Sequence, residues 1–238
     1  FTLGKRLCVE GSEMICAMQE SGKADFMGGR AHGYETTESA PTLSIDGQDV
    51  SLSNNGWYRG MAAVFTQRTS MWEYGDPTLT NRRAYRDLTL TAENGELRAE
   101  QSIEWRAAIT LAAGYCAMLP LHRYETYDAV AGTEDTSSAQ ISGEFINNIG
   151  TVLDCSAYTA DPINWTAGVE WWRGTGTYGI TGEVELVGAT GPLGSVGGVQ
   201  RKNYAYNKAY IGFVSAQEVE VGETWTATTR WAIDVQSV

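Results

Sequence analysis

The chain of 238 residues carries 17 Lys and Arg against 29 Asp and Glu, which gives a formal net charge of −12. This acidic balance disfavours nucleic acid and anionic membrane surfaces as partners, because their phosphates repel it. Charged residues make up only 19% and aromatic residues 11% of the chain, a composition that excludes intrinsic disorder. No run approaches the roughly 20 apolar residues of a transmembrane helix, so no membrane insertion is expected, and no signal peptide is visible.

Alternation of apolar and polar residues is the dominant pattern, and it predicts half-buried β-strands. In chain order the predicted strands are 42–45, 60–67, 88–92, 96–106, 113–119, 143–146, 169–172, 182–187, 204–215 and 224–235. Asn94-Gly95, between two of these runs, is a strong signal for a tight hairpin. The stretch from Gly188 to Gly198 is predicted to be a long flexible loop, and it lacks the Lys of a phosphate-binding loop.

Two of the predicted strands indicate which residues face a core. The inward-facing residues are predicted to be Leu97, Ala99, Ile103, Trp105, Trp225, Ala227, Thr229, Trp231, Ile233 and Val235. No segment carries the apolar spacing of an amphipathic helix over three turns. Ten or more short strands joined by turn residues predict one all-β domain over residues 1–238, built as an antiparallel β-sandwich or jelly roll.

Residues that carry common enzymatic chemistry are scarce. The two histidines, His32 and His122, have no metal-binding spacing, and no Gly-x-Ser-x-Gly motif is present. No Asp-x-Asp-x-Asp-Gly loop surrounds Asp154 or Asp161, which leaves a calcium site without support. No metal and no cofactor are therefore expected.

The four cysteines are Cys8, Cys16, Cys116 and Cys155, and none belongs to a Cys-x-x-Cys motif. Buried free thiols that pack as small apolar groups are the favoured interpretation, and no catalytic cysteine is expected. A pair of Cys8 and Cys16 facing each other across a hairpin is the alternative.

Tyr204, Tyr206, Lys208 and Tyr210 alternate along one predicted strand and should project from one of its faces. Three phenol groups and an ammonium group are costly in a closed core but suit a wet groove, where the rings stack on a sugar. A solvated face with cross-strand aromatic pairs is the alternative. Trp57 and Trp172 are further candidate aromatic contacts to a ligand.

Charged residues alternate along the outward face of the strand at 96–106. They are Arg98, Glu100, Glu104 and Arg106, with Ser102 between them. Surface ion pairs are the favoured interpretation of this row. The alternative is one wall of a polysaccharide cleft, in which an arginine neutralises a uronate.

Short motifs in the first half of the chain resemble β-sandwich domains of bacteriophage tail proteins. These motifs are His32-Gly-Tyr-Glu35, Ser44-Ile-Asp-Gly47, Thr66-Gln-Arg-Thr69, Ile103-Glu-Trp105 and Ala117-Met-Leu-Pro120. The resemblance implies a receptor-binding or accessory module of a virion or an extracellular protein. Its partners would be a surface glycan and either further copies of the chain or other virion proteins.

A second segment is similar to jelly-roll polysaccharide lyases. Tyr206-Asn-Lys-Ala-Tyr210 matches part of their Tyr-x-Lys-x-Gly-x-Tyr pattern but lacks the glycine, and Gln140-Ile141 is followed by Ser142 where the family has a histidine. In a lyase, Arg98 would neutralise the uronate, His122 or Tyr206 would act as base, and Tyr210 as acid with Lys208 assisting. Glycan binder, lyase and purely structural virion protein remain three open functions, so the sequence does not decide whether the protein is an enzyme.

Overall fold

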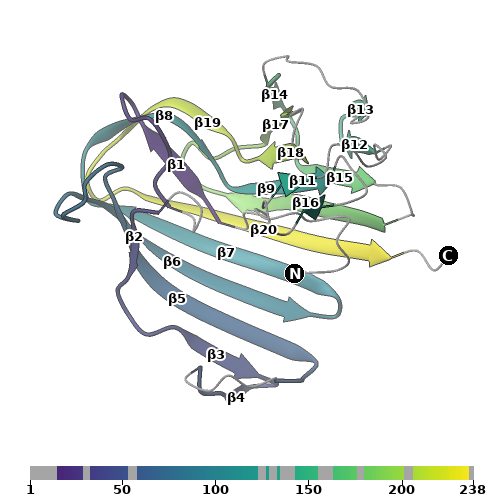
Figure 1. Ribbon diagram of the computed structural model, residues 1–238. Helices are drawn as coiled ribbons and strands as arrows, with labels where there is room; N and C mark the ends of the chain where they lie inside the picture. The colour runs from purple at the N-terminus through teal and green to yellow at the C-terminus, as the bar shows by residue number, and fades with distance from the viewer. Residues whose placement is uncertain are drawn as a thin grey trace.

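The computed structural model describes residues 15–28, 33–52, 58–122, 127–128, 133–134, 143–154, 163–175, 180–200 and 206–235. Within these ranges the regular elements are all β-strands, and they pair antiparallel. They form two facing layers, which confirms the predicted all-β antiparallel sandwich (Figure 1). No helix that could cross a membrane occurs in the described ranges.

One layer is a single sheet of 11 strands, called the large sheet below. Its strands in spatial order are β13 (Val152–Asp154), β12 (Glu144–Asn147), β15 (Trp171–Thr175), β16 (Ile180–Ala189), β20 (Thr224–Val235), β7 (Glu96–Trp105), β6 (Arg82–Glu93), β5 (Ala62–Trp72), β3 (Thr42–Ile45) and β4 (Gln48–Asp49), with β2 (Glu35–Thr37) also paired to β5. The long strands β5, β6, β7, β20 and β16 form its middle, and β3 and β4 lie at its far edge (Figure 1).

The second layer consists of two smaller sheets. The four-stranded sheet has the order β14 (Thr166–Ala167), β17 (Val196–Gln200), β18 (Tyr206–Ile211) and β9 (Ala117–His122), and the three-stranded sheet has the order β1 (Ala17–Glu20), β8 (Ile109–Tyr115) and β19 (Val214–Val219). A separate ribbon pairs β10 (Tyr127–Asp128) with β11 (Thr133–Glu134). The two sheets adjoin where β8 leads into β9 through Cys116 and β18 leads into β19 through Gly212 and Phe213.

The core lies between the layers and follows the alternation of the sequence. In β7 every second residue from Leu97 to Trp105 is buried, while the charged residues between them face outward. The residues predicted to face inward on β7 and β20 are buried from Leu97 to Trp105 and from Trp225 to Trp231, which confirms that part of the prediction. The side chains of Ile233 and Val235 lie outside the described part of the structure. The indoles of Trp105 and Trp225 meet edge to face with their ring centres 5.0 Å apart, an arrangement that adds about 0.5–1.5 kcal/mol to the burial of the rings.

Turn residues explain where the strand predictions hold and where they do not. Asn94 and Gly95 both have positive φ, 53° and 80°, and close the predicted hairpin between β6 and β7. The predicted strand at 204–215 is broken at Gly212, whose φ of 70° ends β18. The predicted loop at 188–198 is shorter than expected, because β16 continues to Ala189 and β17 begins at Val196. Sequence reasoning treated every glycine there as a turn signal, although Gly197 and Gly198 lie inside β17.

Candidate functional site

Two of the four residues predicted to share one face of the tyrosine-rich strand, Lys208 and Tyr210, do share it. Along β18, Asn207, Ala209 and Ile211 are each 0% exposed and face the large sheet, so Lys208 and Tyr210 point to the other side of the strand. Tyr206 pairs with His122 of β9 in the ladder, which brings the backbones of two predicted residues together. The side chains of Tyr206 and His122, and the whole of Tyr204, lie outside the described part of the structure.

Tyr210 belongs to a closed aromatic cluster in place of the open groove expected for it. Its side chain is only 8% exposed, and its ring packs against Tyr115 at 5.0 Å and Trp165 at 5.8 Å between centres. Trp165 is itself stacked on Phe213 at 3.5 Å. The covering is possible because Gly198, opposite Tyr210 on β17, has no side chain; a Cβ there would lie 2.8 Å from Trp165.

Trp172 is a core residue and not the surface contact that the sequence suggested. It is 2% exposed, and its indole N–H donates to the Tyr210 carbonyl at 3.1 Å, which joins the large sheet to the second layer. Its neighbour Trp171 takes the outward face of β15, half-buried, with the Arg173 guanidinium 5.6 Å from its ring centre. Trp57 lies outside the described residues.

Arg98 and the tyrosine-rich strand lie on opposite sides of the molecule. Leu97 and Ala99 point into the core, so Arg98 projects from the outer face of the large sheet, where its 51% exposed side chain pairs with Glu100 at 3.1 Å. Lys208 and Tyr210 project from the outer face of the second layer. Packed sheets are about 10 Å apart even before side chains are added. The lyase assignment that joined Arg98 to Lys208 and Tyr210 is therefore corrected, because these groups cannot meet around one sugar.

The outward row of β7 forms the ion pairs that the sequence favoured. Glu104 accepts from Arg106 at 2.8 Å, two residues along the strand, as Glu100 does from Arg98. Glu104 also reaches across β6 to Arg68 of β5 at 3.1 Å. The contact between Glu104 and Arg68 joins the charged residues of β7 to charged residues on β5 and β6.

Glu104 and Arg68 belong to an arginine-rich cluster around one tyrosine, called the Tyr85 cluster below. Its members are Arg68 of β5, Arg82, Tyr85 and Asp87 of β6, Glu104 of β7, Arg106 just after β7, and Glu38 just after β2. Tyr85 sits opposite Ser70 on one neighbouring strand and Glu104 on the other. The guanidinium carbons of Arg68 and Arg82 each lie 4.6 Å from the ring centre of Tyr85, and that of Arg106 lies 5.6 Å from it.

The Tyr85 cluster contains equal numbers of positive and negative side chains, and these side chains are partly exposed to solvent. Arg68 binds Asp87 at 2.8 Å as well as Glu104, and Arg82 binds Glu38 at 3.2 Å and also donates to the Tyr85 hydroxyl. Three arginines thus face three carboxylates, with side chains 29–51% exposed. Exposed ion pairs of this kind contribute about 0–1 kcal/mol to stability. The ion pairs of the cluster therefore contribute little to the stability of the fold.

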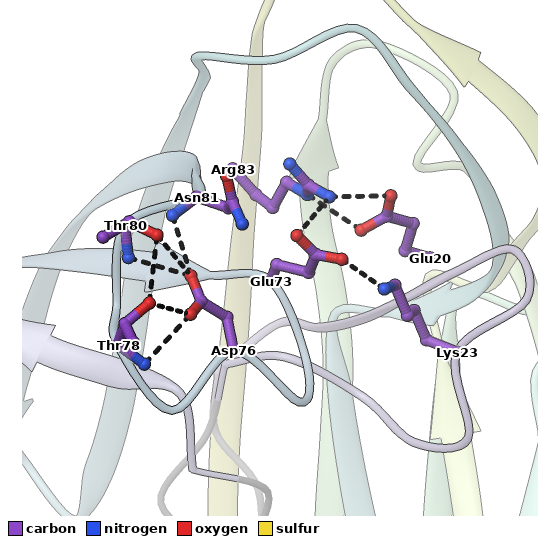
Figure 2. A network of polar contacts seen from close by, with 8 residues as sticks. All are labelled: Glu20, Lys23, Glu73, Asp76, Thr78, Thr80, Asn81 and Arg83. Carbon is purple, nitrogen blue, oxygen red and sulfur yellow. Dashed lines mark hydrogen bonds and ion pairs between the residues drawn. The ribbon is translucent and has the colours of Figure 1, made fainter.

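A second polar network holds the loop from which β6 enters the cluster (Figure 2). Arg83 binds Glu20 of β1 at 2.8 Å and Glu73 at 3.0 Å, and Glu73 also pairs with Lys23. The hydrogen bond from Lys23, aided by the charge of Arg83, lowers the pKa of Glu73. These pairs tie the β5–β6 loop to β1.

Asp76 organises the same loop from within. Its carboxylate accepts from the backbone N–H groups of Thr78, Thr80 and Asn81 at 2.8–3.0 Å, and from the Thr78 hydroxyl at 2.6 Å. The hydrogen bonds from Thr78 and Asn81 lower the pKa of Asp76 well below its usual range. With its carboxylates paired inside the protein, this network is a structural clamp that fixes the start of β6, directly before Arg82 and Tyr85.

Sequence reasoning missed the Tyr85 cluster, although a signal was present. The run from Asn81 to Asp87 contains three members of the cluster, Arg82, Tyr85 and Asp87, and the period of a strand places Tyr85 and Asp87 on one face. In the described part of the chain no group of three or more His, Cys, Asp or Glu residues is arranged to hold a metal ion.

Together these observations define a two-layer antiparallel β-sandwich whose large sheet presents a charged, aromatic outer face. No protein-family model matches the chain, and no curated protein matches it. Among solved structures, the chain is similar to the galactosidase domain of the alpha-galactosidase-sucrose kinase AgaSK, with 7% identity and a TM-score of 0.50. The alignment covers 97% of this chain and 31% of that one, so the chain spans less than a third of its length.

Two further solved structures match with lower scores. The Slr1438 protein from Synechocystis sp. PCC 6803 is 11% identical over 82% of this chain and 73% of that chain, with a TM-score of 0.42. A mutant of the heparan sulfate lyase HepC from Pedobacter heparinus is 10% identical over 83% of this chain and 24% of that chain, with a TM-score of 0.36. At such identities a likeness concerns the fold, and the function has to be argued from the site.

Proposed function

We propose that the protein binds a carbohydrate on the outer face of the large sheet, at the Tyr85 cluster. The observation that carries the proposal is the bridge made by Arg68, which binds Asp87 and Glu104 while lying against the Tyr85 ring. Each sugar hydroxyl both donates and accepts a hydrogen bond. An arginine fork held beside a carboxylate offers both partners in fixed positions.

The balance of charge in the cluster favours a neutral sugar. Three arginines and three carboxylates leave no net positive charge to attract a uronate or a sulfate. The site lies on the long central strands β5, β6 and β7, and side chains on such strands hold their geometry better than side chains on loops. The solved structure that shares this fold is named as a galactosidase domain, and this name supports a sugar as the ligand.

The resemblance to phage-tail domains suggests in which kind of protein such a glycan-binding domain would occur. A glycan-binding sandwich of a virion or extracellular protein would recognise a surface glycan, as a single chain or as a homo-oligomer. The lyase alternative is not carried further, because Arg98 faces away from Lys208 and Tyr210.

A glycan array with neutral and acidic oligosaccharides tests the proposal, followed by calorimetric titration of the strongest ligand. Arg68→Ala is expected to weaken binding at least about 10-fold, since it removes a charge-assisted donor and releases two carboxylates. Arg98→Ala is the matched control: the same substitution, on the same face of the sheet, outside the cluster. It should change binding less than about twofold.

A third variant separates the two outer faces. Lys208→Ala should leave binding unchanged, because Lys208 lies on the second layer. Binding that survives Arg68→Ala but disappears in Lys208→Ala would move the site to the tyrosine-rich strand. A chain that binds no glycan on the array would overturn the proposal itself.

A further inference from the structure

Cys16 and Cys116 are both fully buried free thiols, and both belong to the core between the layers. Cys16 directly precedes β1, and Cys116 directly follows β8. The β1–β8 ladder pairs Ala17 with Tyr115 and Met18 with Gly114. One step further out, the same antiparallel register sets Cys16 opposite Cys116.

Backbone hydrogen bonds show which kind of cross-strand pair this is. Met18 exchanges both of its backbone bonds with Met27, on the side away from β8. Backbone groups alternate in direction along a strand, so Cys16 has the same phase as Met18. Its N–H donates to the Gln101 side chain at 2.6 Å, and its carbonyl accepts from Arg86 at 3.3 Å.

Cys116 also turns its backbone away from Cys16, because its N–H donates to the carbonyl of Ile211 in β18 at 2.9 Å. The two cysteines therefore form a non-hydrogen-bonded pair. The Cα atoms of such pairs are about 4.5 Å apart. That spacing falls within the range of about 4.4–6.8 Å in which a disulfide closes without backbone movement.

Both cysteine side chains lie in the core between the layers, and the register of the β1–β8 ladder puts them on the same face. The neighbouring Cys16 thiol and burial raise the pKa of the Cys116 thiol, which donates to the Gly212 carbonyl at 3.6 Å. Gly212 lies on the other side of Cys116 and makes room for its thiol. A Cβ on Gly212 would lie 2.3 Å from the sulfur of Cys116.

We propose that Cys16 and Cys116 form a cross-strand disulfide when the chain folds in the presence of a small-molecule disulfide such as oxidised glutathione. One cysteine thiolate attacks glutathione disulfide and releases one glutathione thiol. The other cysteine then attacks the mixed disulfide and releases the second. The two cysteines lose two protons and two electrons, and one glutathione disulfide becomes two thiols.

Because the two thiols are buried in the folded chain, the disulfide forms during folding or local opening. Both thiols are 0% exposed in the folded chain, so glutathione reaches them during folding or local opening. Once formed, the bond joins the start of β1 to the end of β8 and closes a loop from residue 16 to residue 116. A long closed loop restricts the unfolded chain strongly. Oxidation is therefore expected to raise the midpoint of thermal unfolding by about 5–15 °C.

Peptide mapping of the unaltered chain is the direct test. The protein is unfolded and refolded either with a mixture of oxidised and reduced glutathione or with excess dithiothreitol, and remaining thiols are then alkylated in denaturant. Trypsin alone leaves Cys8 and Cys16 in one peptide, because no Lys or Arg lies between Arg6 and Lys23. Additional cleavage after Glu10 and Glu13 separates the two cysteines.

A linked pair of peptides containing Cys16 and Cys116, present only after oxidative refolding, supports the proposal. Recovery of both cysteines as alkylated thiols after oxidative refolding, or linkage of either one to Cys8 or Cys155, would overturn it. Unfolding midpoints add an independent readout: the oxidative rise should vanish in Cys116→Ala and persist in the control Cys155→Ala. If Cys116→Ala does not fold, the peptide map of the unaltered chain decides alone.

Discussion

Asp76 shows how one carboxylate can order a whole loop. The residues after it, Pro77 to Asn81, turn the chain from β5 back into β6, and the N–H groups of Thr78, Thr80 and Asn81 donate to the two carboxylate oxygens of Asp76. Because the ionised carboxylate accepts all of these bonds, its pKa lies far below its usual value. Part of the stability of the loop therefore depends on the charge of Asp76.

This dependence predicts acid sensitivity. A group whose pKa is lower in the folded chain contributes stability above about pH 4, and that contribution is lost as the pH falls through the lower folded-state value. Glu73, whose pKa is also lowered, acts in the same direction. Asp76→Asn should lower the unfolding midpoint at neutral pH and make it fall less steeply in acid. Thermal unfolding followed by circular dichroism between about pH 7 and about pH 2 measures both effects.

Glu100→Gln is the matched control for this series. It also replaces a carboxylate by an amide, but on the exposed outer face of β7, where the 46% exposed carboxylate pairs with Arg98. Its acid profile should follow that of the unaltered protein. A parallel profile in Asp76→Asn would show that the loop does not depend on the charge of Asp76.

Among the elements, β17 brings aromatic side chains close to both of its faces. Gly197 faces the core, where a Cβ would lie 2.7 Å from Trp172 and 2.7 Å from Val169. Gly198 faces outward, where Trp165 covers it. Consecutive glycines in a strand lower its intrinsic stability, but here they allow the large sheet and the outer aromatic cluster to approach the same strand.

Gly197→Ala should therefore destabilise the fold by about 1–3 kcal/mol, the usual cost of overpacking a core. The added methyl group would separate the Trp172 indole from the Tyr210 carbonyl, which it bonds at 3.1 Å. Denaturant unfolding followed by tryptophan fluorescence measures the loss. Gly194→Ala is the control, because the nearest heavy atom to its added Cβ lies at 3.9 Å. Equal stability of the two variants would contradict the close approach at Gly197.

The sequence predicts the strands and the face on which each side chain lies. It does not predict which other residues pack against that face. The alternation at 96–105 correctly predicts which residues of β7 are buried, and the alternation at 206–211 correctly separates Ala209 from Tyr210. The solvent exposure of Tyr210 was inferred from its polarity alone. Trp165, which buries it, lies 45 positions away in the chain and directly precedes β14. The pairing of β14 with β17, and of β17 with β18, brings it there.

For the whole molecule, the placement of the two sheets relative to each other determines which residues can share one functional site. A sequence gives the face of each strand but not the relative placement of two sheets. The lyase mechanism joins Arg98 and Tyr210 because the sequence places each of them on an outward face of its strand. The sandwich has two such faces, and they point in opposite directions. The Tyr85 cluster avoids this problem because its members come from neighbouring strands of one sheet and from the residues directly after them.

The net charge of the whole molecule gives the last prediction. A chain with a formal charge of −12 repels an anionic polymer, and the balanced Tyr85 cluster does not offset that repulsion. Binding of a neutral oligosaccharide should change less than about twofold between about 50 mM and about 500 mM NaCl, because salt screens interactions between charges and a neutral ligand carries none. Alginate, a uronate polymer, should bind more weakly than the neutral ligand at both salt concentrations. Titration calorimetry measures both, and tight alginate binding that weakens steeply with salt would show that the glycan site is a cationic surface other than the Tyr85 cluster.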